Sequence, residues 1–283
     1  MNNKKINCII TGATNGIGKA LAYRLAKDDI NLFLVARNKN SLKKLQDQLN
    51  KKFNLKVKIF CIDISVENSV KRILKYMKEK NFKIDCIVNC AAVIGDAGKI
   101  ENISSRKWDY TIKVNLYGAF YLFKYLLSIM NKSSLFINFS GGGGTLPQPY
   151  LDAYSASKAA VVRLTENVSL NYNKRDICFT TIAPGGINTK IFLELKKLGK
   201  NKLGPNLWKE IKQRIISGGD DINNPIELIT YVLKLKDRSA FNGRVISAKY
   251  DNWNKIYKNS KKLKKNDLFK LRRIDLTNSK ITL

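Results

Sequence analysis

The sequence predicts an α/β fold in which a doubly wound, mostly parallel sheet carries helices on both faces. Two observations predict it. Short apolar runs alternate with helix-like stretches six times, and the apolar runs are hydrophobic at nearly every position rather than at alternate positions. Strands that are buried on both faces have this composition, and parallel strands need helical crossovers. Ligands of such a sheet bind beyond the carboxyl ends of its strands.

The expected elements follow one another along the chain. Apolar residues at helical spacing, such as Leu42, Leu45 and Leu49, indicate the helices. The expected strands span residues 5–11, 31–36, 57–62, 84–89, 135–140, 177–182 and 244–247. The expected helices span residues 19–27, 41–53, about 65–80, 104–130 (one long helix or a pair), about 150–173 and 225–235.

One domain followed by a tail is the simplest division of the chain. Residues 1–249 form the domain, which includes a polar and basic flap at about 188–205. Residues 250–283 form a lysine-rich tail. Trp253 and Tyr257 supply apolar anchors, so we expect the tail to pack on the domain or on a sister subunit.

The composition narrows the class of protein. A chain of 283 residues with 44% hydrophobic residues is long enough for one large α/β domain. Apolar runs are too short for a membrane span or a signal peptide, so we expect a cytoplasmic protein without membrane contact. The net charge of +30 suggests an anionic partner. The lysines are spread along the chain, so we favour composition as the explanation and expect no nucleic-acid partner.

Cysteine and histidine usage excludes several chemistries. The five cysteines lie in strand-like runs without a Cys-x-x-Cys pair, so we expect buried thiols rather than disulfides or a metal site. Histidine is absent from the chain. Acid/base chemistry near neutral pH must therefore use a tyrosine, a lysine or a carboxylate with a shifted pKa.

A glycine-rich turn, Gly12-Ala13-Thr14-Asn15-Gly16-Ile17-Gly18, lies between the first strand and the first helix. Glycines let a chain turn tightly near a phosphate, and the helix N-terminus offers free N–H groups. The turn predicts a dinucleotide site. Arg37 ends the second strand, where an arginine suits the 2′-phosphate of NADP and an acidic residue would suit NAD. Lys39 could assist it.

Tyr154 and Lys158 are four residues apart in an expected helix and so share one face. A neighbouring ammonium group favours the phenolate, so we expect Lys158 to lower the pKa of Tyr154. The pair predicts a general acid/base.

Taken together, these motifs resemble the short-chain dehydrogenase/reductase family of the single-domain type. They occur in the family's order and spacing over roughly residues 5 to 190. The resemblance implies a Rossmann-type, mostly parallel seven-stranded sheet, NADP (or NAD) as cofactor, and a homodimer or homotetramer formed through helices 104–130 and 150–173. The matching motifs are Thr11–Gly18, Asp63, Asn89-Cys90-Ala91-Ala92, Asn115, Tyr154-x-x-x-Lys158 and Pro184–Thr189.

The same resemblance implies residue roles. Tyr154 is the proton donor or acceptor, Lys158 holds the nicotinamide ribose, and Asn115 anchors a water of the proton relay. The cofactor-binding residues it implies are Gly12, Thr14, Asn15, Gly16, Ile17, Gly18, Arg37, Asp63, Ile64, Asn89, Ala91, Tyr154, Lys158, Pro184, Gly185, Ile187 and Thr189.

The chain departs from the family pattern at the catalytic serine. The family places this serine 13 residues before the tyrosine, which is Gly141 here, and Ser140 comes one residue early. Either the four glycines that follow let Ser140 turn into the site, or a backbone N–H or the substrate takes its role. A family subgroup with a similar Ser-Gly-Gly-Gly loop matches this stretch and residues 243–248 and 271–274.

The expected function is hydride transfer between NADP(H) and the carbonyl or secondary alcohol of a small molecule. One alternative is a reductase of an anionic substrate, either a 3-oxoacyl-carrier protein or a nucleotide sugar, which would give the basic surface a use. A second alternative is a dinucleotide-binding module without catalysis, which the displaced serine suggests. Loops at 94–100 and 146–151 and the flap would shape the substrate pocket, and the sequence does not define the substrate.

Overall fold

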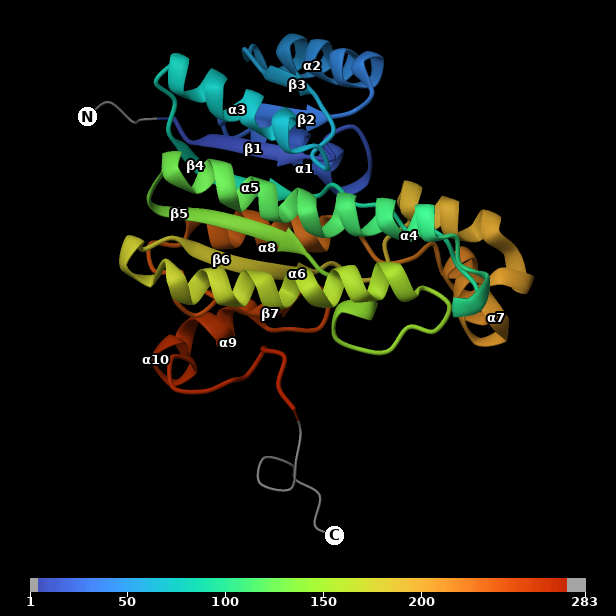
Figure 1. Ribbon diagram of the computed structural model, residues 1–283. Helices are drawn as coiled ribbons and strands as arrows, with labels where there is room; N and C mark the ends of the chain where they lie inside the picture. The colour runs from blue at the N-terminus through green and yellow to red at the C-terminus, as the bar shows by residue number, and fades with distance from the viewer. Residues whose placement is uncertain (1–4, 274–283) are drawn as a thin grey trace.

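Seven parallel strands form one sheet in a computed structural model of the protein, which describes residues 5–273. The strand order is β3-β2-β1-β4-β5-β6-β7. Strands β1 to β3 are therefore added towards one edge of the sheet and β4 to β7 towards the other, and the switch lies between β1 and β4. The strands are β1 (Asn7–Thr11), β2 (Asn31–Ala36), β3 (Lys58–Cys61), β4 (Ile84–Asn89), β5 (Met130–Phe139), β6 (Cys178–Ala183) and β7 (Val245–Ser247). The predicted fold class is confirmed (Figure 1).

Helices cover both faces of the sheet (Figure 1). The helices before β5 are α1 (Gly16–Ala26), α2 (Lys39–Phe53), α3 (Glu67–Glu79), α4 (Ser105–Ile112) and α5 (Gly118–Leu126). Those after it are α6 (Asp152–Asn171), α7 (Lys190–Ser217), α8 (Asn223–Lys234), α9 (Trp253–Lys258) and α10 (Ser260–Leu263). The expected helix at 104–130 is a continuous helical stretch that contains one π-helical turn, Lys113–Tyr117.

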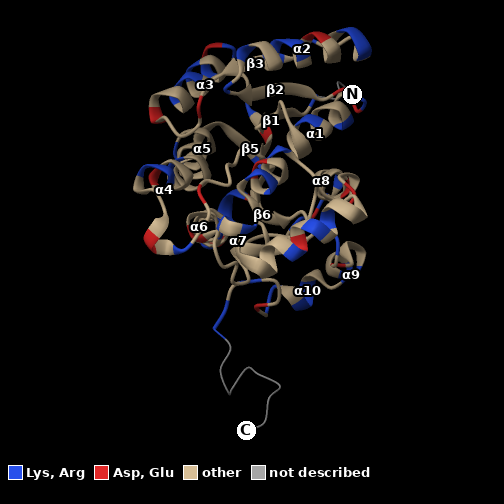
Figure 2. Cartoon of the chain, turned by 90° about the vertical axis from the view of Figure 1, so that its right-hand side faces the viewer, with Lys and Arg blue, Asp and Glu red and all other residues tan. Residues whose placement is uncertain are grey.

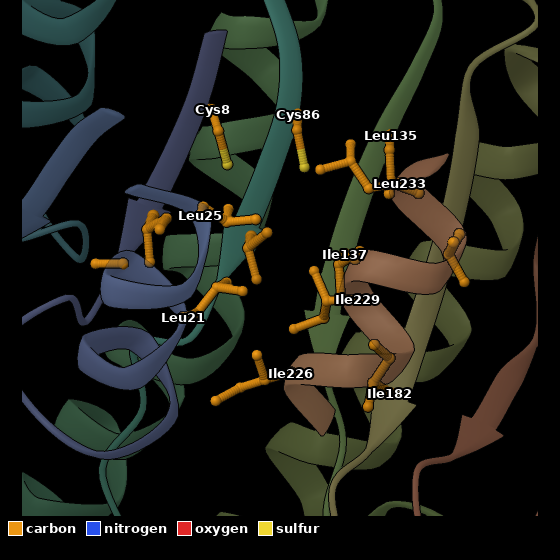
Figure 3. Packing of buried hydrophobic residues seen from close by; sticks show 14 of the residues in the cluster. Cys8, Leu21, Leu25, Cys86, Leu135, Ile137, Ile182, Ile226, Ile229 and Leu233 are labelled. Carbon is orange, nitrogen blue, oxygen red and sulfur yellow. The ribbon is translucent and has the colours of Figure 1, made fainter. Parts of the chain in front are cut away.

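Successive side chains of each strand point to opposite faces of the sheet, so the hydrophobic core has two layers. Ile10 faces the cluster formed with α1, α2 and α8, whereas Ile9 faces the cluster formed with α3, α5 and α6. Figure 3 shows Leu21 of α1 and Ile229 of α8 packed over the strands of the first layer. Because successive strand residues point to opposite faces, a strand buried on both sides needs an apolar residue at each position.

Helix α7 differs from the expected flap. The sequence predicted a polar and basic flap at about 188–205, but helix α7 runs from Lys190 to Ser217 and is kinked at Gly199 and Gly204. Its apolar face forms a third cluster, in which Phe192 and Leu203 pack against Leu151. This distant contact partner is why a stretch that looks polar along the chain is helical.

Two cysteines differ from the expectation of buried thiols. Cys8, Cys86 and Cys178 are buried, but Cys61 is exposed and Cys90 is half-buried. Cys61 ends the edge strand β3, which has only one neighbouring strand. Cys90 follows the end of β4, where the chain leaves the core.

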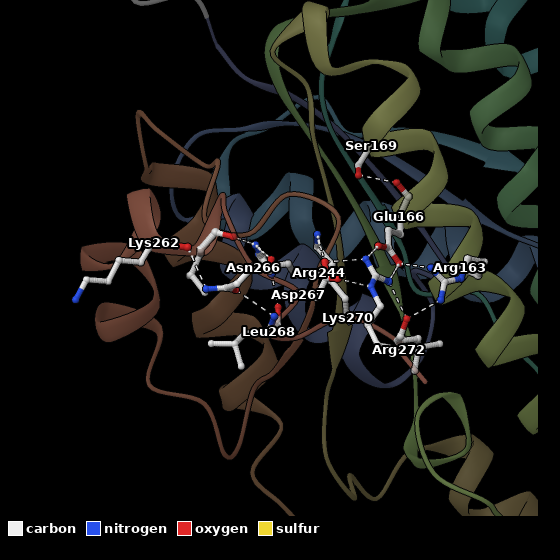
Figure 4. Close-up of polar contacts among 12 residues, drawn as sticks. Arg163, Glu166, Ser169, Arg244, Lys262, Asn266, Asp267, Leu268, Lys270 and Arg272 are labelled. Carbon is white, nitrogen blue, oxygen red and sulfur yellow. Dashed lines mark hydrogen bonds and ion pairs between the residues drawn. The ribbon is translucent and has the colours of Figure 1, made fainter. Parts of the chain in front are cut away.

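The described part of the tail lies against α6. Arg272 forms an ion pair with Glu166, at 2.5 Å between Nη2 and Oε1, and Arg163 pairs with the same carboxylate at 2.6 Å (Figure 4). Arg244 is buried and donates to the backbone carbonyls of Leu263 and Leu268. The division of the chain at residue 249 stays a prediction, and residues 1–4 and 274–283 lie outside the described part.

Basic side chains are distributed over the molecule. Figure 2 shows lysine and arginine on helices of both layers, including α1, α2, α4 and α8. Within residues 5–273, no helix is both long enough and apolar enough to cross a membrane.

We predict that Glu166→Gln destabilises the protein and loosens the tail. The Glu166 carboxylate is 5% exposed and pairs with two arginines; Arg163 would lose its ion pair, and Arg272 would keep only its pair with Asp267. Because the arginines are partly exposed, the loss is expected to be about 1–2 kcal/mol rather than the larger value of a fully buried pair. Urea unfolding and the rate of proteolytic cleavage after residue 263 measure it. The exposed Glu101→Gln is the control, and equal stability of both variants would contradict the prediction.

Candidate active site

A cavity of about 360 Å³ opens at the carboxyl ends of the strands, where loops from both halves of the sheet meet α7. Its volume is within the range of ligand-binding pockets. The predicted site residues that line it are Gly12, Thr14, Asn15, Gly16, Ile17, Gly18, Arg37, Asp63, Ile64, Ala91, Ser140, Tyr154, Lys158, Pro184, Gly185, Ile187 and Thr189. Asn89 and Asn115 are buried and do not line the cavity.

The glycine turn approaches neighbouring backbone too closely for a side chain. A Cβ on Gly12, where φ is +63°, would lie 2.9 Å from the Ala91 backbone, and one on Gly18 would lie 2.6 Å from the Gly12 carbonyl oxygen. Helix α1 begins at Gly16, and the Asn15 side chain does not cap it. Its first N–H groups therefore remain available to an anion in the cavity.

A ladder of buried polar groups connects the strands under the cavity to α6. The Thr11 hydroxyl donates to Asn89 Oδ1 at 2.6 Å, and Asn89 Nδ2 donates to Asn138 Oδ1 at 2.9 Å. Asn138 Nδ2 in turn donates to the Thr165 hydroxyl at 3.0 Å. The ladder thus crosses β1, β4 and β5 and ends on α6. Buried amides and hydroxyls need such partners, because an unpaired one costs about 1–3 kcal/mol. Asn89 therefore occupies a structural position below the cavity.

Tyr154 and Lys158 lie on the face of α6 that borders the cavity. Lys158 is 5% exposed, and its ammonium group donates to the Phe139 carbonyl at 2.9 Å. This bond attaches the first turns of α6 to the end of β5. The Lys158 Nζ lies 5.7 Å from the centre of the Tyr154 ring. The geometry brings both side chains to one wall, as their spacing predicted.

Burial controls the protonation of this pair. It raises the pKa of Tyr154 to about 12, and it lowers the pKa of Lys158 to about 8. The expectation that Lys158 lowers the tyrosine pKa is therefore wrong for this structure, because desolvation of the phenolate outweighs any attraction to the ammonium group. The charge that does oppose the rise of the Tyr154 pKa is the guanidinium of Arg214.

Asn115 lies in the π-helical turn between α4 and α5. Its side chain makes three hydrogen bonds: Oδ1 accepts from the Val93 N–H at 2.9 Å, and Nδ2 donates to the Val93 carbonyl and to the Ser157 hydroxyl, each at 3.0 Å. It joins the end of β4 to α6 one residue before Lys158. π-Helical turns are rare and occur often at functional sites.

The structure shows which of the neighbouring positions 140 and 141 faces Tyr154. A Cβ on Gly141 would lie 2.9 Å from the Tyr154 hydroxyl, so position 141 faces the tyrosine. The Ser140 hydroxyl donates to the Gly141 carbonyl at 3.2 Å and lies against Gly144. Gln148 also lines the cavity, and its Oε1 is buried without a hydrogen-bond partner among the described residues.

Arg37 follows β2 at the opposite end of the cavity from Tyr154. Its guanidinium lies 3.8 Å from the Asp63 carboxylate and donates to the Tyr110 hydroxyl. Asp63 also accepts from the Ser65 N–H at 2.9 Å and the Ser65 hydroxyl at 2.7 Å. The side chain of Arg37 is 54% exposed, so its charge is accessible to a ligand.

Sequence reasoning missed two residues around the site, Asp220 and Arg214. Asp220 accepts from the Gly186 N–H at 2.6 Å and pairs with Lys249 at 2.7 Å, which fixes the loop after β6. Arg214 lines the cavity itself, as does Gln148 of the loop at 146–151 that was expected to shape the pocket. Asp220 and Arg214 lie outside any recognisable motif, and only the folding of α7 and of the segment after it brings them here. No local pattern could have identified them.

Comparison with known proteins defines the family. The chain matches the short chain dehydrogenase family over residues 7–198, more than half of its length, and therefore belongs to that family. Among its relatives, the uncharacterized oxidoreductase YxbG of Bacillus subtilis (strain 168) is 30% identical over 244 residues, which are 85% of this chain and 88% of the relative. A 3beta-hydroxysteroid dehydrogenase of Mediterraneibacter gnavus is 30% identical over 184 residues, 65% of this chain and 66% of the relative.

Two solved structures illustrate the likeness of fold. Levodione reductase superposes with a TM-score of 0.75 at 25% identity and covers 86% of this chain and 95% of its own. A single-substitution variant of actinorhodin polyketide ketoreductase, solved with NADPH, has a TM-score of 0.76 at 21% identity with the same coverage. At 21% identity, the likeness to the ketoreductase is evidence for the fold alone.

We predict that Gly141→Ala lowers kcat about ten- to a hundredfold. The added methyl group would lie 2.9 Å from the Tyr154 hydroxyl and would displace the phenol, and a shift of this kind is costly for a reacting group. Steady-state kinetics measures it. Gly142→Ala, whose methyl group would meet no atom within 4 Å, is the matched control and should lower kcat much less. Equal rates in the two variants would contradict the role of Tyr154.

Proposed function

We propose that the protein is an NAD(P)-dependent oxidoreductase that transfers a hydride between a nicotinamide and a carbonyl or secondary alcohol carbon of a small molecule. The observation that carries this proposal is the shared cavity. Tyr154 and Lys158 lie along the same cavity as the glycine turn and the open N-terminus of α1. A proton donor and a phosphate-binding turn along one cleft are what a dinucleotide-dependent reductase requires.

The residues present fit a dinucleotide. The absence of side chains at Gly12 and Gly18 lets the turn pack tightly against its own backbone at the edge of the cavity, and the free α1 N–H groups suit a pyrophosphate. Membership of the short chain dehydrogenase family also supports this cofactor. When bound, the cofactor supplies the hydride chemistry, and the remaining tasks fall to side chains of this chain.

Tyr154 is the proposed proton donor to the substrate oxygen. With a pKa of about 12 it is protonated at neutral pH and can donate a proton to a carbonyl oxygen. Lys158 has a pKa of about 8, close to neutral pH, so its ammonium group is suited to supply a proton to Tyr154 after Tyr154 has donated its own. Asn115, through Ser157 and Val93, holds the two elements around the lysine in register.

Three groups of this chain are candidates to take the place of the family's catalytic serine. Ser140 lines the cavity although its hydroxyl donates to the Gly141 carbonyl, and Gln148 lines the same cavity. A backbone N–H of the glycine run is the third. The position of Ser140 is also the observation that favours a non-catalytic dinucleotide-binding module. The Ser-Gly-Gly-Gly subgroup remains our assignment for this loop.

NADP is the proposed preference, because Arg37 presents an accessible guanidinium at the end of β2. We also propose a cytoplasmic homo-oligomer assembled through α4–α5 and α6. The exposed rings of Tyr117 (44% exposed) and Phe120 (42% exposed) support it, since neighbouring exposed aromatic residues mark association surfaces.

We predict that Tyr154→Phe abolishes most hydride transfer. Loss of the phenolic proton should lower kcat about 100- to 10,000-fold, while the Kd of NADPH changes little. A carbonyl panel monitored by NADPH absorbance, with fluorescence titration of the cofactor, measures both. Tyr250→Phe, at a tyrosine that is 78% exposed, is the control. Full activity in Tyr154→Phe would refute the mechanism, and tight NADPH binding without turnover of any carbonyl by the wild type would favour the non-catalytic module.

We predict that Arg37→Ser raises the Kd of NADPH about ten- to a hundredfold and leaves the Kd of NADH nearly unchanged. A charge-assisted hydrogen bond to the 2′-phosphate is worth about 1.5–3 kcal/mol, and NADH has no such group. Arg106→Ser, on the exposed side of α4, is the control. A wild type that binds NADH more tightly than NADPH, or an equal loss for both dinucleotides, would contradict the assignment.

A further inference from the structure

Arg214 places a positive charge inside the cavity that the proposed reaction does not use. It comes from α7, and its guanidinium carbon lies 4.3 Å from the centre of the Phe192 ring. On the other side, a Cβ on Gly186 would lie 3.4 Å from its Cζ and Nε. One N–H group, on Nη2, donates to the Ile187 carbonyl. The guanidinium is therefore held between an aromatic ring and the loop after β6, in a defined orientation beside the reacting end of the cavity.

No carboxylate of the described residues lies within ion-pair distance of this charge. Within residues 5–273 no carboxylate forms an ion pair with Arg214, and its Nε is buried without a hydrogen-bond partner. Asp220 is the acid whose charge acts on Arg214, but its carboxylate is already bound by Lys249 and the Gly186 N–H. Glu194 also borders the cavity and lies 3.9 Å from Lys190. A half-buried arginine with a free donor is costly unless a ligand supplies the missing anion.

A purely structural role explains the contacts poorly. The bond to the Ile187 carbonyl needs one N–H donor, which a neutral glutamine could provide. The stacking on Phe192 needs a planar or apolar group. Neither contact requires a full positive charge, and burial already lowers the pKa of Arg214. The retained charge is the feature that calls for a ligand.

The location of Arg214 indicates that its ligand is an anionic group of the substrate and not a phosphate of the cofactor. The glycine turn and Arg37, which suit phosphate groups, lie at the β1 and β2 side of the cavity. Arg214 lies beside Ile187 and close enough to Tyr154 for its charge to oppose the rise in the tyrosine pKa. An anion bound to Arg214 would therefore be part of the molecule whose carbonyl meets Tyr154.

We propose that Arg214 binds a carboxylate of the substrate, so that the enzyme acts on oxo or hydroxy acids in preference to neutral ketones or alcohols. The inference rests on the proposed function. Arginine is suited to this task because its planar N–H groups match a carboxylate.

The test compares each acid with its own methyl ester, over a panel of short 2-oxo and 3-oxo acids with NADPH. The wild type is expected to show a kcat/KM for the acid about ten- to a hundredfold above that for the ester. In Arg214→Gln this acid-to-ester ratio should fall about a hundredfold, mainly through KM, because the charged group would lose its partner. Arg214→Lys should restore part of the ratio, and Arg106→Gln should leave it unchanged. A wild type that prefers esters, or an Arg214→Gln variant that keeps the acid-to-ester ratio, would overturn the proposal.

A binding measurement separates this inference from the proposed reaction. Benzoate and benzamide have similar shapes, and neither can be reduced by hydride transfer under these conditions. Calorimetric titration of the NADPH-loaded protein should show benzoate binding at least about tenfold more tightly than benzamide in the wild type, and this preference should vanish in Arg214→Gln. If no carbonyl is reduced but the preference is present, the reaction is wrong and the anion site stands. If acids and esters are reduced alike and the benzoate preference is absent, the reaction stands and the anion site is wrong.

Discussion

The buried polar ladder from Thr11 through Asn89 and Asn138 to Thr165 is the interaction on which the site depends. It crosses three strands at the switch point of the sheet and ends on α6. Each group satisfies its neighbour in an apolar interior, so a change in strand register or a shift of α6 would leave several polar groups unpaired. The helix that carries Tyr154 and Lys158 is thereby fixed relative to the glycine turn at the end of β1.

Desolvation then gives the fixed side chains their chemistry. The wall around Tyr154 is apolar enough to raise its pKa to about 12 and to lower that of Lys158 to about 8, so proximity of a cation is the smaller effect. Lys158 is also bonded to the Phe139 carbonyl, so it serves both as a potential proton carrier and as a tie between β5 and α6. Because the surroundings have low polarity, the charge of Arg214 also acts on the pKa of Tyr154.

The C-terminal third of the chain completes a cavity that the sheet only begins. Helix α7 covers it through an apolar cluster that includes Phe192 and Leu203, and Asp220 fixes the loop after β6 through Gly186. The last described residues bind Glu166 on the outer part of α6. The net charge of +30 is distributed over the surface, whereas the charge that bears on the proposed substrate choice is the guanidinium of Arg214.

The sequence by itself determined the order of the motifs along the chain, the parallel sheet, the glycine turn and the Tyr154–Lys158 pair, because period-based burial and short-range spacing are local properties. Only the tertiary structure decided that Gly141 rather than Ser140 faces Tyr154, that burial reverses the expected pKa shift of the tyrosine, and that Arg214 enters the cavity. These outcomes depend on distances between segments far apart in the chain. Local patterns encode which residues can form an element, whereas packing decides which of their groups meet and how much water remains between them.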